Sequence, residues 1–290
     1  MEAGVPTEVS NSPAAGLRGD YSRAASDYSV EQDWGAYTAG EQALWRRLFR
    51  RQIALLPGYA CDTYRDSLAR LDASEGIPKL DEVTGELRRA TGWSLVPVPG
   101  LIPDLAFFDH LAHRRFPVTR WLRNPEEFDY IVEPDVFHDF FGHVPMLFNA
   151  WFADYMQAYG EGGLKAARLD ALRMLARLYW YTVEFGLIAT EAGLRIYGAG
   201  ILSSGGEVVH SIDSPKPRRV MFDLERVLRT DYHIDRYQDT YFVIKSFEQL
   251  FTDTLPDFTP LYARLRARPV LAPQEPFPGD IVMGPSNRLS

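Results

Sequence analysis

Two histidines stand five residues apart in a mostly apolar segment, PDVFHDFFGHVPML, residues 134–147. Five residues of a regular α-helix would turn His138 and His143 about 140° apart, so a straight helix cannot point both rings at one ion. Gly142 permits a turn, and Pro145 disfavours helical geometry at the residue before it. We therefore expect the chain to bend between the two histidines, which would let both imidazoles bind one metal ion.

A metal held by two histidines needs a third protein ligand, and Glu184 is the candidate. A carboxylate flanked by Val183 and Phe185 in an apolar helix costs free energy unless it is paired or bound to a metal. Two histidines and one carboxylate are the ligands of non-haem iron(II) oxygenases. The same ligand types also suit a zinc hydrolase, with Asp139 as the adjacent candidate for a general base. Spacing alone does not show that Glu184 meets the two histidines.

The elements that must position these side chains are mainly helices. Helical periodicity is strongest over residues 169–190, which we predict to form one long helix without proline. Shorter helices are expected over 38–56, 77–92 and 104–116. Residues 93–102 contain two prolines and read as an extended or β-like piece. The sequence thus predicts a mainly α fold with minor β content, in a single domain.

The two ends of the chain differ from its centre in composition. Residues 1–30 are rich in Ala, Ser, Gly and Pro and lack apolar periodicity, so we expect a flexible N-terminal tail. Residues 266–290 are rich in proline, and we expect them to extend over the surface. The domain proper is then residues 31–265.

Composition excludes several kinds of partner. The formal net charge of −8 disfavours nucleic acid and anionic membrane surfaces, which both require a basic face. The one cysteine, Cys61, cannot form an internal disulfide, and it fits a reducing compartment. No apolar run approaches the roughly 20 residues of a membrane span, and the first residues lack the pattern of a secretion signal. We expect a cytoplasmic protein.

Four longer motifs lead to a family. They are VPGLIPDLAFFDHLAHRRFPVTRWLR (98–123), EPDVFHDFFGHVP (133–145), LARLYWYTVEFGL (175–187) and IYGAGILSS (196–204). In these motifs and their order, the chain resembles the catalytic domain of the pterin-dependent aromatic amino acid hydroxylases, and most closely the bacterial members that act on phenylalanine. Weaker similarity runs from about residue 34 to about 258. The resemblance implies that residues 31–265 form the family's mostly α catalytic domain, with iron in a deep pocket.

The resemblance assigns the metal and the second cofactor. It implies Fe(II) held by His138, His143 and Glu184 as the catalytic ligands, in agreement with the set chosen from residue types above. It also implies a tetrahydrobiopterin that stacks on an aromatic ring and contacts a backbone loop before it. The residues implied for pterin binding are Gly100, Leu101, Ile102, Phe107, Glu133 and Asp139.

The resemblance also implies how the amino-acid substrate is held. Arg123 would bind its carboxylate, because a guanidinium fork suits a bidentate contact with that group. Asp135 would hold the arginine in place, while Trp180 and Ser203 would line the pocket. Family members that act on tyrosine tend to carry an acidic residue in the loop DYHIDRYQ, where this chain has Ile234. An apolar residue there favours phenylalanine, although an aspartate follows directly.

The activity implied is that of a phenylalanine 4-monooxygenase, which converts L-phenylalanine to L-tyrosine with O2 and tetrahydrobiopterin. The alternatives are tryptophan or tyrosine hydroxylation within the same family, or a protein that binds metal or pterin without catalysis. The short segment before residue 34 leaves no room for a regulatory domain, and no coiled coil ends the chain. We therefore expect a monomer whose partners are small molecules.

Overall fold

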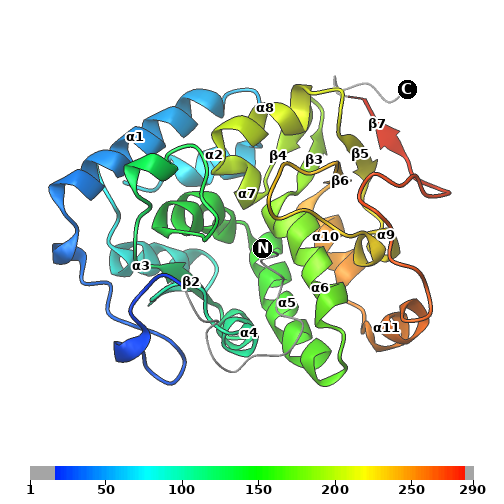
Figure 1. The fold of residues 1–290 in the computed structure, drawn as a ribbon, viewed down its shortest axis with the longest axis horizontal. Coiled ribbons are helices and arrows are strands. Elements are labelled where there is room, and N and C mark those ends of the chain that lie inside the picture. Colours follow the sequence, from blue (N-terminus) through cyan, green and yellow to red (C-terminus); the bar gives the residue numbers. More distant parts are fainter. Residues whose placement is uncertain (1–16, 285–290) are drawn as a thin grey trace.

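Helices are the main secondary structure of the described chain, residues 17–284 of the computed structural model, and they pack around two small sheets (Figure 1). This confirms the predicted mainly α fold with minor β content. The α-helices are α1 Ala39–Leu55, α2 Asp62–Leu68, α3 Leu80–Ala90, α4 Asp104–Ala112, α5 Ala150–Arg168, α6 Leu172–Tyr179, α7 Ala199–Leu202, α8 Gly205–Asp213, α9 Leu224–Arg229, α10 Phe247–Thr254 and α11 Thr259–Leu265. Among the described residues, no helix has the length and apolar character needed to cross a membrane.

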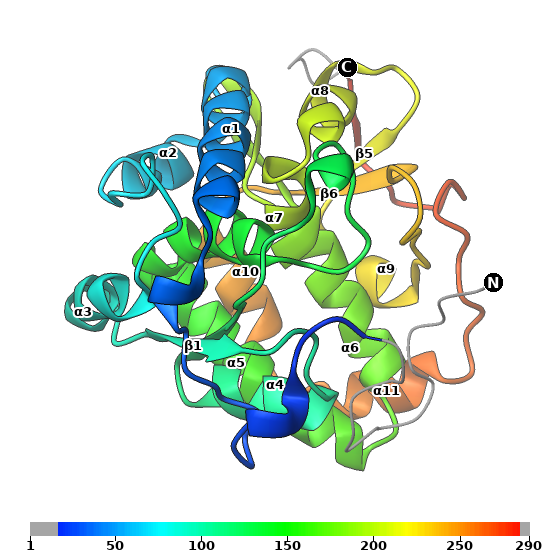
Figure 2. The same ribbon diagram turned by 60° about the vertical axis from the view of Figure 1, so that its left-hand side comes forward.

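The larger sheet has five strands in the order β4-β3-β6-β5-β7. Strands β3 and β5 both run parallel to β6, whereas β4 and β7 run antiparallel to their neighbours. The smaller sheet is the parallel pair β1-β2, joined through α4. Figure 2 shows β1 and α4 in the lower half of the view and α8 and β5 in its upper half. The strands are β1 Ser94–Val98, β2 Arg115–Thr119, β3 Leu187–Thr190, β4 Gly193–Ile196, β5 Arg218–Met221, β6 Thr240–Ile244 and β7 Val282–Met283.

The predicted positions of the first helices and of the first strand agree with the structure. Helix α1 begins at a capping box in which Thr38 accepts from the backbone N–H of Glu41, and the Glu41 carboxylate accepts from that of Thr38. Helices α3 and α4 fall inside the segments expected to be helical, and β1 falls inside the expected extended piece.

The prediction of one long helix over residues 169–190 is wrong. The chain turns at Asp170, whose φ of 49° lies in the left-handed region, and α6 ends at Tyr179. A π-helix, η6 Trp180–Glu184, follows, and residues 187–190 form β3. The reason is tertiary: the backbone of β3 pairs with β4 and β6 in the larger sheet. Apolar periodicity in one segment cannot reveal pairing with strands distant in sequence.

Residues 17–30 and 266–284, the described parts of the two predicted tails, lie against the rest of the chain. The backbone N–H of Arg18 donates to Glu133, and the Tyr21 hydroxyl donates to the carbonyl of Leu101. At the other end, the buried carboxylate of Asp280 forms ion pairs with Arg218 of β5 and Arg226 of α9. Residues 1–16 and 285–290 lie outside the described residues.

Candidate metal centre and substrate pocket

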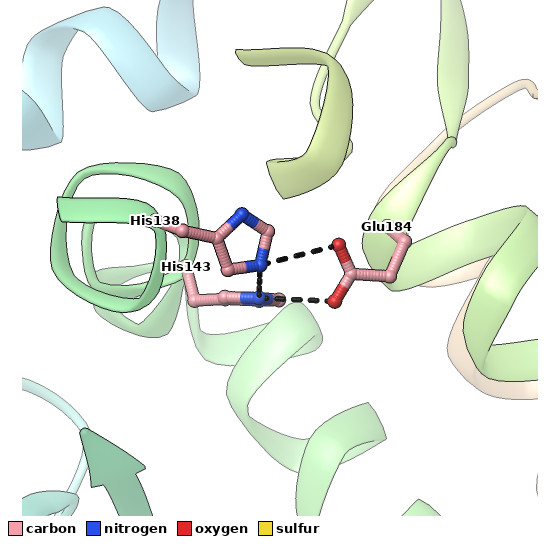
Figure 3. Close-up of side chains that lie close together, drawn as sticks. All are labelled: His138, His143 and Glu184. Carbon is pink, nitrogen blue, oxygen red and sulfur yellow. Dashed lines mark hydrogen bonds and ion pairs between the residues drawn. The ribbon is translucent and has the colours of Figure 1, made fainter. Parts of the chain in front are cut away.

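The side chains of His138, His143 and Glu184 converge on one point (Figure 3). The His143 Nε2 atom lies 3.1 Å from Glu184 Oε1, and His138 Nε2 lies 3.6 Å from Glu184 Oε2. The two histidine Nε2 atoms are 3.3 Å apart. In residues 17–284 this is the one group of three or more His, Cys, Asp or Glu side chains with this convergence. The structure therefore brings together the three residues chosen from the sequence.

A π-helix, η4 His138–His143, directs both histidines to the same side. In a π-helix the hydrogen bond joins residues five apart, so residues with that spacing lie one above the other. The expected bend between the histidines is therefore absent, and Gly142 is not among the glycines with positive φ. A 3₁₀ segment, η5 Val144–Phe148, begins only after His143.

The opposite side of η4 is buried in an aromatic core. Phe137, Phe140 and Phe141 are fully buried. The rings of Phe137 and Phe141 stack at 4.9 Å, and Trp45 of α1 meets Phe137 edge-on at 5.3 Å. Since these contacts fix the rotation of η4 about its axis, they also fix the direction in which its two histidines point.

Ser203 sets the tautomer of His138. Its hydroxyl donates to the carbonyl of Ala199 at 2.9 Å, so its oxygen accepts from His138 Nδ1, also at 2.9 Å. With the proton on Nδ1, the lone pair of Nε2 faces His143 and Glu184. A second hydrogen bond of this kind orients metal-binding histidines in general.

The three side chains form a donor set suited to a divalent cation. Burial alone would raise the pKa of Glu184, but His143 and His138 hold it well below its usual range. Burial would lower the pKa of His138, but the facing Glu184 carboxylate, together with Asp139 and Asp135, outweighs this and raises the pKa. Two ligand atoms bound at about 2.1 Å and at right angles lie about 3 Å apart, close to the spacing of these donors. The residues present therefore fit one bound metal ion.

Beside these side chains lies a cavity of about 340 Å³, within the size range of small-molecule sites. His138 and Glu184 form part of its wall, so a metal held there would be open to the cavity. Its remaining walls come from the segment after Arg123, from η6 and α8, and from the loop 233–238. The other lining residues are Leu101, Arg123, Asp129, Tyr130, Ile131, Val132, Pro134, Tyr179, Trp180, Phe185, Gly200, Ser203, Ser204, Glu207, His233, Ile234, Arg236, Tyr237 and Gln238.

Arg123 reaches this cavity from a buried ion pair with Asp135. Its Nε and Nη2 atoms donate to the two carboxylate oxygens at 2.8 and 2.9 Å, and its backbone N–H donates to one of them. The same carboxylate accepts from the backbone N–H of His138 at 2.9 Å. Asp135 therefore fixes the arginine relative to the metal centre and leaves the Nη1 group of Arg123 for another acceptor.

Two further residues predicted to bind the substrate also line the cavity. Trp180 stacks on Tyr232 with ring centroids 4.3 Å apart, which fixes the plane of the indole. Ser203 lines the cavity beside His138, with which it shares a hydrogen bond. The four residues implied for substrate binding thus lie together, with Asp135 behind the wall.

The six residues implied for pterin binding are spread more widely. Leu101 lines the cavity and is 41% exposed. Phe107 does not line it, but packs edge-on against Tyr179, which does. The carboxylates of Glu133 and Asp139 accept from backbone N–H groups of Arg18 and Thr119. Gly100 lies under the N-terminal segment, and Ile102 is half-buried.

Sequence reasoning missed a buried acidic residue in the cavity wall. Glu207 is 5% exposed and stands next to two valines in α8. This is the signal that identified Glu184, an acidic side chain among apolar neighbours, and it could have identified Glu207 as well.

Gly142→Ala is expected to lower the free energy of unfolding by about 1–3 kcal/mol, the usual effect of overpacking. The added Cβ would lie 2.9 Å from the Cβ of Ala199 and 3.0 Å from its carbonyl oxygen. Neither atom is the end of a flexible side chain, so α7, and with it Ser203, would have to move. Denaturant unfolding measures the loss.

Gly162→Ala is the matched control, because its added Cβ would meet no atom within 4 Å. In the middle of α5, this change is expected to stabilise the protein by about 0.5–1 kcal/mol. Equal unfolding midpoints for the Gly142→Ala protein and the wild type would show that α7 packs less tightly on η4 than described.

A helical domain with two histidines and one carboxylate beside a cavity has the architecture of a mononuclear non-haem iron enzyme. Residues 17–265 match the family model of the biopterin-dependent aromatic amino acid hydroxylases, and the chain belongs to this family. The family, its fold and its dependence on a biopterin cofactor, all implied by the sequence motifs, are thereby confirmed.

Relatives and solved structures agree with this membership. The chain is 58% identical over 276 residues to the phenylalanine-4-hydroxylase of Ralstonia nicotianae, with 95% of this chain and 88% of the relative covered. It is 54% identical over 265 residues to the phenylalanine-4-hydroxylase of Chromobacterium violaceum, with 91% and 89% covered. The iron- and phenylalanine-bound crystal structure of the latter enzyme matches with a TM-score of 0.86 and 54% identity, covering 92% of this chain and 97% of that chain.

Proposed function

We propose that this protein is a phenylalanine 4-monooxygenase, which converts L-phenylalanine to L-tyrosine with O2 and tetrahydrobiopterin. One observation carries the proposal: in a biopterin-dependent hydroxylase, His138, His143 and Glu184 converge beside a cavity that also contains Arg123. The three residues are the proposed iron ligands. Bound Fe(II), with O2 and the reduced pterin, supplies the oxidising chemistry.

The chain's own residues place the substrate. The Nη1 group of Arg123 is the proposed donor to the substrate carboxylate, held in position because Asp135 takes the other side of the guanidinium. Trp180 and Ser203 form the proposed walls around the aromatic ring. Fixed donors and walls speed a reaction by holding the reacting atoms in the required geometry.

Phenylalanine is the proposed substrate for two reasons. Relatives that are 58% and 54% identical are named phenylalanine-4-hydroxylase. The side chain of Ile234 lines the cavity and is apolar, so it offers no partner to the hydroxyl of tyrosine. Tyrosine or tryptophan hydroxylation remains the alternative within the family.

For tetrahydrobiopterin we propose the side of the metal centre on which Leu101 lies. Phe107 is the proposed ring against which the pterin stacks, and it packs on Tyr179 of the cavity wall. The backbone of residues 100–102 is the proposed contact of the pterin edge, with Glu133 and Asp139 nearby.

We further propose a cytoplasmic monomer with residues 31–265 as its catalytic domain. The single cysteine, Cys61, is buried and free, as suits a reducing compartment. The net charge of −8 supports small molecules, not nucleic acids or anionic membranes, as partners. Light scattering on the purified protein measures whether its mass is that of one chain.

A turnover assay tests the proposed activity. Purified protein loaded with Fe(II), then given tetrahydrobiopterin, O2 and phenylalanine, is expected to form tyrosine, and zinc-loaded protein is expected to form none. Pterin oxidation without tyrosine would redirect the search to tyrosine or tryptophan as substrate. If neither pterin oxidation nor tyrosine is detected, the alternative of a protein that binds metal or pterin without catalysis becomes the favoured one.

A further inference from the structure

Glu207 is a buried carboxylate in the cavity wall that the proposed chemistry does not use. It lies in the first turn of α8, and its Oε1 atom accepts two hydrogen bonds from one neighbouring stretch of chain. The hydroxyl of Tyr241 donates at 2.7 Å, and the backbone N–H of Gln238 donates at 3.3 Å. A buried carboxylate is costly without such partners, so these bonds account for its presence in the fold.

Gln238 connects Glu207 to the rest of the loop 233–238. Its side chain is 1% exposed, and its Nε2 atom donates to the carbonyl of His233 at 2.6 Å. Its Oε1 atom accepts from the backbone N–H of the same residue at 3.3 Å. The two ends of the loop are therefore tied to each other through Gln238, and the whole loop is tied to α8 through Glu207.

The loop forms one wall of the cavity. Five of its six residues, His233, Ile234, Arg236, Tyr237 and Gln238, line it. Ile234, Arg236 and Tyr237 are exposed on their outer side, so packing alone holds the loop weakly. Tyr237 also lies directly on Gly206, where an added Cβ would fall within 1.9 Å of its hydroxyl oxygen. The loop 233–238 therefore packs against the first turn of α8 and is hydrogen-bonded to it.

We propose that Glu207 is a positioning residue that holds the loop 233–238 in place as a wall of the amino-acid pocket. The inference rests on the proposed function, because the pocket it shapes is the proposed phenylalanine site. Glu207 acts through Gln238 and Tyr241, not by contact with the reacting atoms.

The environment of Glu207 agrees with a structural role for its oxygen. Burial raises the pKa of this carboxyl to about 7, although the bonds from Tyr241 and Gln238 act in the opposite direction. An acceptor for two donors is what the site requires, and an amide oxygen at the same position can accept both bonds. This distinguishes Glu207→Gln, which keeps the acceptor, from Glu207→Ala, which removes it.

The first test follows the loop without turnover. Hydrogen exchange at the backbone amide of Gln238 is expected to speed up by about tenfold or more in Glu207→Ala, because its acceptor is gone. In Glu207→Gln the exchange rate is expected to stay within about threefold of the wild type. Unchanged exchange in Glu207→Ala would overturn the proposed anchor.

The second test measures whether the contact between Glu207 and the loop affects binding of the amino-acid substrate. In Glu207→Ala the KM for phenylalanine is expected to rise about tenfold, which corresponds to about 1.4 kcal/mol. The KM for tetrahydrobiopterin and the iron content of Glu207→Ala are expected to stay within about twofold of the wild type. In Glu207→Gln the KM for phenylalanine is expected to equal that of the wild type. A loop that loosens without a change in this KM would overturn the positioning role.

Ser211→Ala is the matched control. Ser211 is buried one turn further along α8, does not line the cavity, and donates one hydrogen bond to the carbonyl of Val208. An equal rise in KM for this variant would mean that any weakening of α8 has the effect, and would count against Glu207. If the wild type forms no tyrosine, calorimetric binding of phenylalanine replaces KM, so failure of the proposed activity is distinguishable from failure of the anchor.

Discussion

Glu184→Ala is expected to lower both iron affinity and tyrosine formation by more than about a hundredfold. Loss of an outer partner of a metal ligand costs about 10–100-fold, and loss of a direct ligand costs more. Glu184 supplies the one negative charge of the donor set, with its oxygens 3.1 and 3.6 Å from the two histidine Nε2 atoms. Without it, a cation faces two neutral imidazoles.

Iron content after dialysis and single-turnover tyrosine formation measure this effect. Glu184→Gln keeps the size of the side chain and removes its charge, so it separates a loss of ligation from a loss of folding. Glu191→Ala, at an exposed glutamate in the turn after β3, is the control and is expected to behave as the wild type. Full iron content and turnover in Glu184→Ala would refute the ligand role.

Arg123→Lys is expected to raise the KM for phenylalanine by about thirtyfold or more, with iron content unchanged. Lysine keeps the positive charge beside Asp135, which is fully buried and would otherwise lie unpaired. It cannot supply a fork that holds one carboxylate and binds a second. Disrupting a buried, hydrogen-bonded charge contact costs about 2–5 kcal/mol, and the lower end of that range corresponds to the expected change.

Steady-state kinetics with a second substrate make this prediction specific. Phenethylamine lacks the carboxylate, so the preference for phenylalanine over phenethylamine is expected to shrink in Arg123→Lys. Arg120→Lys, at an arginine three residues earlier that does not line the cavity, is expected to leave the preference unchanged. A preference retained in full by Arg123→Lys would assign carboxylate binding to another residue.

Several features were within reach of the sequence because they depend on residues close together in the chain. The helix expected over residues 38–56 is α1, Ala39–Leu55, which begins at a capping box formed by residues three apart in the chain. The residue types of His138, His143 and Glu184 narrowed the metal site to a non-haem iron or a zinc centre, because ligand chemistry belongs to the side chain itself. The motifs around them specified the family, and the family specified the fold.

The prediction from local geometry was wrong where tertiary contacts determined the backbone. The histidine spacing does not suit an α-helix, and a bend at Gly142 was the local solution. The protein instead forms a π-helix, packed on one side by Phe137 and Phe140. Gly142 serves the close approach of Ala199, a contact between segments more than fifty residues apart in the chain.

What the sequence by itself determined was the ligand chemistry of the centre, two imidazoles and one carboxylate, and through its motifs the family, which implied an arginine with its aspartate. What only the tertiary structure decided was their convergence and the wall around them. The three metal-binding candidates meet because η4 and η6 both pack against α7, and Glu207 faces the loop 233–238 because the first turn of α8 lies against that loop. Such positions depend on long-range packing and strand pairing, whose energies no single segment of the chain contains.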